Sequence, residues 1–395
     1  MPSPQPKPRP ARLLSRDIVL IMAATFCFMS ASMLASPIIA GFAGKLGADG
    51  TVMGLVAGAL SLTALFCRPV AGRLADRTSK RRLAIVGGGL YVIANVWYAC
   101  CTNAAMLLCA RILNGVGFAC ISVCLSAWLA MLLPIERMGA GMGLYGTMNA
   151  LAQAVGPDLG IRASATIGYR PAFLIAAALA AAVVVLALCV RDAGRPLATA
   201  QAQRTPLRLH TLFEPRVVPI AVIFMMFGIP YFANQSFLVS IAAERHMGTD
   251  VSVYFPIYAV VLLIVRILLR NWFDTKSFAF WMVTCTACNL GMLACLTFMR
   301  SLPLLAAAAV LTAGSYGLMS SVTQANAVTI AGKERSGMAN TTYYAGIDLG
   351  MFIGPLIGGA LYQSLPDLWF YPLLALTMPV AWAIWLPWHA RQSKN

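Results

Sequence analysis

The chain has 395 residues, of which 60% are hydrophobic and only 11% are charged, and its mean hydropathy is +0.77. This composition excludes an ordinary soluble domain, because apolar runs of about 20 residues, each long enough to cross a bilayer, recur along the whole chain. The formal net charge of +16 would favour a nucleic-acid partner in a soluble protein. Here the basic residues fall in the short segments between apolar runs, so we expect a lipid bilayer around the chain and no nucleic acid.

Twelve membrane-spanning helices are predicted from the apolar runs, so the expected fold class is an all-α polytopic membrane protein. Most Lys and Arg residues fall on the side that holds the N-terminus, and the positive-inside rule places that side in the cytoplasm. An even number of spans then puts both termini in the cytoplasm. With no organelle-targeting signal, we expect the cytoplasmic (inner) membrane of a bacterium. The expected spans cover residues 18–39, 50–70, 82–101, 104–132, 141–161, 169–190, 217–240, 252–270, 277–298, 302–330, 337–362 and 368–388.

Over about a hundred residues, the chain matches itself without a gap when it is aligned with a copy shifted by 198 residues. The matched positions are charged residues, Gly, Pro and Tyr, which rarely coincide by chance. This parallel repeat predicts two six-helix halves, at 18–190 and 217–388. A basic loop at 191–216 connects them, and 1–17 and 389–395 are cytoplasmic tails. The matches include Arg68 with Arg266, Asp76 with Asp274, Tyr145 with Tyr343, Gly156-Pro157 with Gly354-Pro355, and Gly160 with Gly358.

Three motifs stand out in the first half: "GRLADRTSKRR" at 72–82 between the second and third spans, "RILNGVGFA" at 111–119 in the fourth, and "AVGPDLG" at 154–160 in the fifth. They resemble motifs of the major facilitator superfamily. The last is similar to the Gly-Pro motif of the family's proton-driven exporters. The chain departs from the family patterns at Ser79, where Gly is usual, and at Asp158, directly after the proline.

The resemblance covers essentially the whole chain and implies a fold in which two halves rock around a central site. The run "SGMANTTYYAGIDLGMFIGPLIGG" near the C-terminus also resembles one branch of the proton-coupled exporters. That branch includes drug exporters, sugar-efflux-like proteins and exporters of opine-type metallophores.

The loop at 72–82 is predicted to act as a conformational latch between the halves. Glycine lets the second span end close to a neighbour, and Asp76 would face the start of the eleventh span, where backbone N–H groups carry partial positive charge. The family resemblance implies the same role. In the alternative interpretation the basic cluster only anchors the topology. The expected latch residues are Gly72, Asp76, Arg77, Arg81 and, in the second-half copy, Asp274.

Arg111 is expected about two turns into the fourth span, which the resemblance places beside the central cavity. A permanently charged guanidinium there must meet water, a carbonyl or an acid. Its role is therefore substrate binding, control of a nearby acid, or a structural hydrogen bond to carbonyls of the first span. The candidate substrate-binding residues are Arg111, Asn114, Asn149, Tyr231, Asn234, Gln235, Asn340 and Tyr344.

Glycine followed by proline interrupts both the fifth and the eleventh span. Proline removes a backbone donor and glycine lets another backbone approach, so each span can bend or pack closely at that point. Bending helices at the seam between two halves would serve alternating access, and a static kink is the alternative. The expected bend residues are Gly156, Pro157, Gly354 and Pro355.

Asp348 lies near the midpoint of the eleventh span, where a carboxylate is costly and usually functional. A carboxyl group that is neutral in one conformation and charged in another couples protons to conformation. Asp348 is therefore the first candidate for proton coupling. Binding a cationic part of the substrate, or pairing structurally with Tyr344 or Arg111, are the alternatives. Asp158 is the second candidate, nearer the outer end of its span and with Arg162 as an expected partner one turn on.

Together these features predict a secondary active transporter that exports a small organic molecule in exchange for protons. We expect it to work as a monomer, without cofactor or metal. The spans carry no nucleophile–base pair, so an enzyme is not expected. An importer or uniporter of the same fold and a sensor that moves no substrate remain the alternatives.

Overall fold

A computed structural model describes residues 15–134, 137–195, 214–247, 250–332 and 335–392. Every regular element in these ranges is helical, as the composition predicts. In the first half, long helices follow one another with short connections. They are α1 (Arg16–Lys45), α2 (Gly50–Arg77), α3 (Lys80–Cys100), α4 (Ala104–Leu132), α5 (Met138–Thr166) and α6 (Tyr169–Cys189).

The second half contains the same number of spans, but four of them, counting the eighth (η4 with α9), are built from more than one element. The seventh combines η3 (Pro215–Val217) with α8 (Val218–Glu244), the tenth has a π-helical turn η5 (Ala313–Gly317) between α12 (Leu302–Thr312) and α13 (Leu318–Ala331), and the twelfth joins α15 (Asp367–Leu374) to α16 (Thr377–Gln392). The others are η4 (Val251–Val253) with α9 (Tyr254–Leu268), the short α10 (Arg270–Thr275), α11 (Phe278–Thr297) and α14 (Ser336–Ser364).

Eleven helical segments of the described chain are long and apolar enough to cross a membrane, which confirms the polytopic class. The remaining predicted span, α5, is not among them although it has 29 residues. At about 1.5 Å per residue it is long enough to cross a bilayer, and it packs along α1 within the first-half bundle. Its lower hydropathy reflects its polar residues, which include Asn149, Gln153, Asp158 and Arg162.

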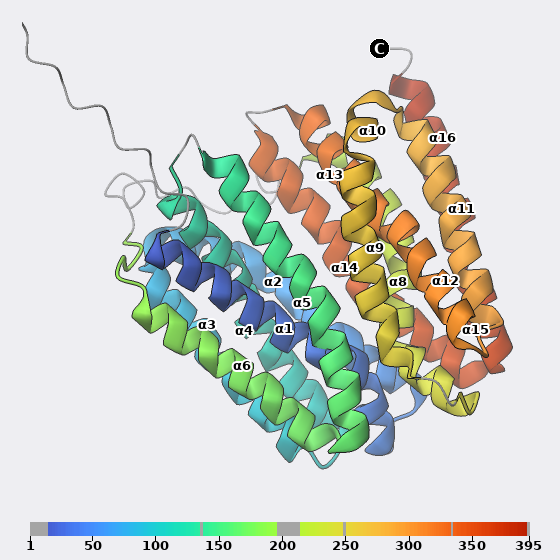
Figure 1. Ribbon diagram of the computed structural model, residues 1–395, viewed down its shortest axis with the longest axis horizontal. Coiled ribbons are helices and arrows are strands. Elements are labelled where there is room, and N and C mark those ends of the chain that lie inside the picture. The colour runs from blue at the N-terminus through green and yellow to red at the C-terminus, as the bar shows by residue number, and fades with distance from the viewer. Residues whose placement is uncertain (1–14, 135–136, 196–213, 248–249, 333–334, 393–395) are drawn as a thin grey trace, which may run out of the picture.

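The halves form two bundles that stand side by side, blue to green on the left and yellow to red on the right in Figure 1. In the first bundle α1 packs on α5 and α6, and α4 packs on α2 and α3. In the second, α8 packs on α14 and α16, and α12 packs on α11 and α9. Contacts within each bundle are extensive, as two separately packed halves require.

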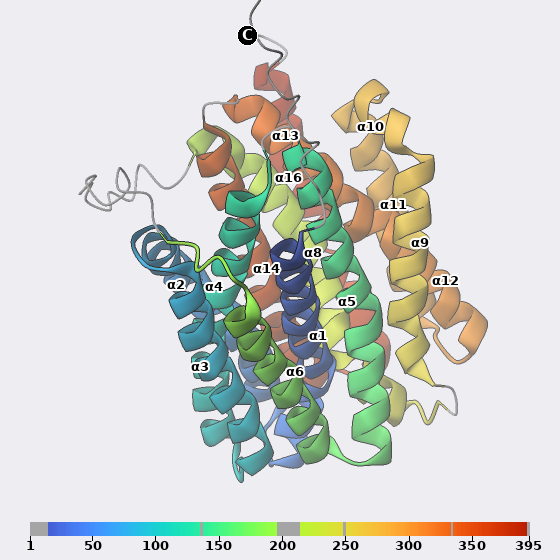
Figure 2. The ribbon, with the colours of Figure 1, turned by 60° about the vertical axis from the view of Figure 1, so that its left-hand side comes forward.

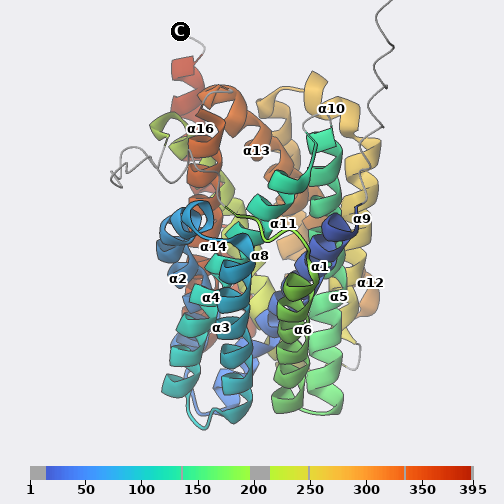
Figure 3. The ribbon, with the colours of Figure 1, turned by 90° about the vertical axis from the view of Figure 1, so that its left-hand side faces the viewer.

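Three helix pairs join the bundles: α2 with α14, α5 with α9, and α1 with α8. The first two pairs form seams on opposite sides of the molecule, as the turned views in Figures 2 and 3 show. The seams are related by the sequence repeat, because α2 corresponds to α9 and α5 to α14. The α2–α14 seam is the more closely packed. Below, the near end of the bundle is the one where α1 begins and α16 ends, and the far end holds the α1–α2 connection.

Candidate functional site

Asp348 forms an ion pair with Arg68 across the α2–α14 seam, in the interior of the bundle. The Nε of Arg68 donates to Oδ2 at 2.7 Å and its Nη2 donates to Oδ1 at 3.0 Å, so the contact is bidentate. The Asp348 side chain is 3% exposed and the Arg68 side chain 26%. Such a paired geometry satisfies a carboxylate in a site from which water is nearly excluded. A buried charge pair therefore links one half of the molecule to the other.

Residues of α4 hold the Arg68 guanidinium in place. It lies over the Phe118 ring at 5.7 Å from the centroid, and its Nη1 lies 3.5 Å from Ser122 Oγ. The sequence left open a pairing of Asp348 with Arg111 or Tyr344, and the structure pairs it with Arg68 instead. The reason is that α2 lies against α14. The repeat had singled out Arg68, but its spacing could not show which helix would be its neighbour.

Glycines close the α2–α14 seam between this ion pair and the far end. A Cβ at Gly54 would overlap the carbonyl of Pro355, and one at Gly58 would lie 2.7 Å from the carbonyl of Phe352. At the far end itself, Thr51 donates from its backbone N and its hydroxyl to Oε1 of Gln363 at 3.1 and 2.8 Å. Direct backbone contact of this kind needs glycine, since any side chain would push the helices apart.

The α5–α9 seam is joined at the same end by charged groups. Arg162 Nε donates to Asp158 Oδ1 at 2.8 Å, which confirms the expected pairing within α5. Arg162 Nη2 also lies 2.9 Å from Asp250 Oδ2, and Ser252 Oγ donates to Asp158 at 2.5 Å. Arg162 thus makes the ionic contact between the halves, while Asp158 holds Arg162 and accepts the Ser252 hydroxyl in a partly exposed position. The role of Asp158 in proton coupling stays a prediction. Both seams are closed at the far end.

The Gly-Pro pairs lie inside continuous helices, because α5 and α14 run through Pro157 and Pro355 without a break. The glycines face partner helices within their own half. A Cβ at Gly156 would lie 2.6 Å from Met33 Cβ on α1, and one at Gly354 would lie 2.7 Å from the Ile229 carbonyl on α8. The repeat therefore uses each Gly-Pro pair for close packing. Bending at these positions stays a prediction.

Arg111 is 3% exposed and is held within the first half. Its Nη2 donates to the Ala57 carbonyl of α2 at 3.2 Å, and its guanidinium interacts electrostatically with the hydroxyls of Tyr91 and Tyr98 on α3. The carbonyl belongs to the second span and not, as one alternative held, to the first. Asn114 lies on the same helix and is equally buried. These contacts favour a structural role for Arg111, and its role in substrate binding stays a prediction.

The other candidate binding residues are divided between the interior of α8 and the two seam helices. Tyr231 stacks on Tyr316 with the ring centroids 4.0 Å apart. Asn234 accepts a hydrogen bond from Tyr371 at 3.0 Å, and Gln235 reaches Met33 Sδ of the first half at 3.8 Å. The seam residues differ from one another. Tyr344 is 43% exposed, whereas Asn149 and Asn340 have buried amide oxygens that accept no hydrogen bond from the described residues.

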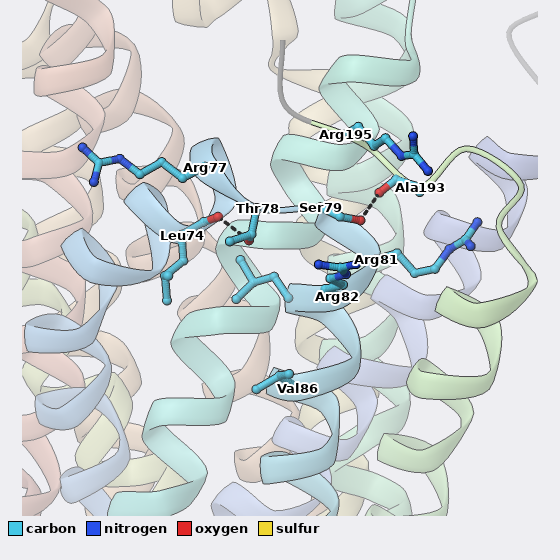
Figure 4. Close-up of a pocket in the computed structure, with 10 residues that line it drawn as sticks. Leu74, Arg77, Thr78, Ser79, Arg81, Arg82, Val86, Ala193 and Arg195 are labelled. Carbon is cyan, nitrogen blue, oxygen red and sulfur yellow. Dashed lines mark hydrogen bonds between the residues drawn. The ribbon is translucent and has the colours of Figure 1, made fainter. Parts of the chain in front are cut away.

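The predicted latch loop lies at the near end and borders a cavity of about 720 Å³ (Figure 4). Arg77 and Arg81 both line it. Arg81 donates to the carbonyls of Val190 and Arg191, which fastens α3 to the end of α6. Among the described residues, no atom would lie within 4 Å of a Cβ at Gly72. The side chains of Asp76 and Asp274 lie outside the described part of the structure, so the latch stays a prediction.

Comparison with known proteins agrees with this architecture. The model of the Major Facilitator Superfamily matches residues 21–299, and the chain belongs to that family. It is 21% identical over 367 residues to multidrug resistance protein 1 of Bacillus subtilis, covering 90% of this chain and 92% of that one. It is 22% identical over 357 residues to the quinolone resistance protein NorA of Staphylococcus aureus, covering 89% and 91%. A crystal structure of a POT family transporter in complex with a thioalcohol conjugated peptide superposes with a TM-score of 0.77 at 14% identity, covering 95% of this chain and 96% of that one. This last likeness concerns the fold.

Proposed function

We propose that the protein exports small organic molecules from the cytoplasm in exchange for protons, by alternating access. The observation that carries the proposal is the bidentate pair between Arg68 and Asp348, which joins the two halves in the interior of the bundle. Membership of a transporter family and full-length similarity to proteins named for drug resistance support export.

Protonation of Asp348 would change the balance between conformations. The charged carboxylate has to stay with Arg68, because an unpaired charge in this site is costly. A protonated carboxyl group keeps at most a hydrogen bond to the guanidinium and no longer holds α14 against α2. Protonation therefore favours separation of the seam, and release of the proton favours the closed seam seen here.

The closed far end fits this cycle if it faces the periplasm. The basic residues of the near end support a cytoplasmic location for that end by the positive-inside rule, with both termini on the same side. The conformation described here would then be closed to the outside. A proton would enter from the periplasmic side after the seam opens and leave to the cytoplasm when Arg68 and Asp348 pair again. The protein would act as a monomer in a bacterial inner membrane.

Gradient-driven transport into inverted membrane vesicles, whose cytoplasmic face points outward, tests the proposal with a panel of fluorescent dyes and fluoroquinolones. We expect at least one compound to move with the pH gradient in the wild type. Asp348→Asn should abolish this dependence while the compound still binds, because asparagine keeps the shape but cannot exchange a proton.

Asp158→Asn is the matched control, since this carboxylate lies at the far end. It should keep gradient-driven transport. Transport by Asp348→Asn that still follows the pH gradient would refute the assignment and bring Asp158 forward. Flux in the wild type that ignores the gradient would indicate a uniporter, and binding without flux would indicate a sensor.

A further inference from the structure

The sequence repeat builds the surroundings of Arg68 a second time around Arg266. A shift of 198 residues turns Arg68, Phe118, Ser122 and Tyr145 into Arg266, Tyr316, Ser320 and Tyr343. Arg68 touches Ser122 and Phe118 and interacts electrostatically with Tyr145. In the second half, Arg266 Nη2 donates to Ser320 Oγ at 3.1 Å, and the guanidinium interacts electrostatically with Tyr316 and Tyr343.

The two arginine sites differ in whether an acidic residue pairs with the arginine. The residue that corresponds to Asp348 under the same shift is Ala150 on α5. Among the side chains that the structure describes, no carboxylate forms an ion pair with Arg266, and its buried Nε atom has no acceptor. Besides the bond to Ser320, it donates one long hydrogen bond, 3.4 Å from Nη2 to the Gly317 carbonyl. The repeat has therefore kept the arginine and its supports but replaced the carboxylate with a methyl group.

Arg266 is on the inward face of its helix, where a permanent charge needs compensation. Tyr254, Tyr258 and Leu262 precede it at four-residue spacing on α9, and all three are buried. A guanidinium in a membrane span normally meets an acid, a carbonyl or water. A hydroxyl and one distant carbonyl leave most of its five donors without a partner in the described chain. An anion that binds there would be paired as Asp348 is paired in the other half.

Two tyrosines that interact electrostatically with this arginine, Tyr316 and Tyr343, belong to a cluster of stacked aromatic rings. Tyr316 stacks on Tyr231 with an interplanar angle of 5° and lies against Phe224 at 5.2 Å between centroids. Phe224 in turn stacks on Tyr343. Tyr316 belongs to the π-helical turn Ala313–Gly317, whereas its counterpart Phe118 lies in the regular helix α4. Turns of this kind inside α-helices are frequent at functional sites because they redirect side chains.

We infer that Arg266 is the anion-binding group of the substrate site and that the transported molecule carries a carboxylate on an aromatic or other apolar body. The carboxylate pairs with Arg266 in the geometry that Asp348 adopts with Arg68, and the apolar body lies along Tyr316 and its neighbours. This inference rests on the proposed function, and it gives that function a substrate class. It assigns the two related arginines different tasks: Arg68 serves the proton and Arg266 serves the substrate.

Binding to the purified full-length protein in detergent tests the inference without any gradient. The probes are 1-naphthoate and its uncharged analogue 1-naphthamide, and the readout is calorimetry or the ligand-induced rise of the unfolding temperature. The wild type should bind the acid at least about tenfold more tightly than the amide, as a charged hydrogen-bonded pair implies. Equal binding of the two probes, or binding of neither, would overturn the inference.

Variants then test whether Arg266 is the residue that produces the preference for the acid over the amide. Arg266→Gln should remove the preference for the acid and leave binding of the amide unchanged, and Arg266→Lys should keep part of it. Arg162→Gln, at the far end, should bind like the wild type. Arg266→Lys also covers the case in which Arg266→Gln does not fold. A preference that survives in both Arg266 variants would show that the anion binds elsewhere.

Asp348→Asn separates this inference from the proposed function. It should lose proton coupling in vesicles but keep the preference for the acid in detergent. An acid preference that disappears in Asp348→Asn and persists in Arg266→Gln would contradict the division of tasks between the two arginines.

Discussion

The two charged residues of the internal ion pair, Asp348 and Arg68, differ in their exposure and in their other contacts. Asp348 is nearly unexposed and has a bidentate partner, whereas Arg68 is partly exposed and has further contacts with α4. The two ends of the pair are therefore not equivalent. Loss of the arginine leaves a carboxylate in an apolar site, while loss of the carboxylate charge leaves a guanidinium that can still reach water.

This asymmetry predicts the outcome of a double-mutant cycle. Arg68→Ala should lower the free energy of unfolding by about 3 kcal/mol, because it strands the Asp348 charge. Asp348→Asn should cost less, and adding it to Arg68→Ala should restore part of the loss. Thermal unfolding at neutral pH of the purified wild type, the two single variants and the double variant gives the four stabilities that the cycle needs. Single-variant effects that simply add in the double variant would show that the pair contributes no coupling.

Residue type and position were enough to single out Asp348 from the sequence, because an acid in the middle of an apolar span is rare. Its partner was not predictable, since a period of 3.6 residues tells which face a side chain occupies but not which helix stands opposite. The role predicted for Arg111 depended on the cavity that the resemblance implied. The structure instead surrounds this arginine with α2 and α3.

At the scale of helices, the α2–α14 seam depends on glycine. The backbone of α14 touches α2 at Gly50, Gly54 and Gly58. On the α14 side, a Cβ at Gly359 would overlap the carbonyl of Gly50. These positions follow a four-residue spacing on α2, so they form one groove along the helix. The groove brings the helices close enough for the Arg68 side chain to span the remaining distance.

Gly54→Ala should therefore open the seam at the far end. A methyl group there would overlap the Pro355 carbonyl, and we expect a loss of about 1–3 kcal/mol in the free energy of unfolding, as for overpacked cores. Gly89→Ala on α3 is the control, because no atom in the described part of the chain lies within 4 Å of a Cβ at that position. Alanine should be neutral or slightly stabilising there through its helix propensity. Equal unfolding temperatures for the two variants would argue against direct backbone contact at the seam.

The order and approximate limits of the helices were predictable, because each apolar run is long and bounded by polar loops. The breaks inside the second-half spans were not. The turn at Ala313–Gly317 interrupts a run that reads as one continuous helix from 302 to 330. Such a turn depends on how Tyr316 packs against α8, and that is tertiary information.

At the scale of the whole molecule, the repeat relates two seams that are closed in different ways. One has glycines and the internal Arg68–Asp348 pair, and the other has the partly exposed group Asp158, Arg162 and Asp250 at the far end. Opening the far end must break both. Only the internal pair can be switched by a proton in a site shielded from bulk water, which is why the account depends on it.

The central claim is that protonation of Asp348 releases α2 from α14, and a distance measurement tests it directly. Lys45 and Ser364 are two exposed positions at the far end, one in each half. Spin labels at these positions report the distance between the halves by pulsed electron paramagnetic resonance. The labels are attached to cysteines introduced at these two positions in a variant whose eleven native cysteines have been replaced.

The wild type should shift toward longer distances when the pH falls from mildly alkaline to mildly acidic, because the protonated carboxyl group no longer pairs with Arg68. Asp348→Asn should show the longer distances at both values of pH. A wild-type distribution that does not change with pH, or a shift that persists in Asp348→Asn, would contradict the account.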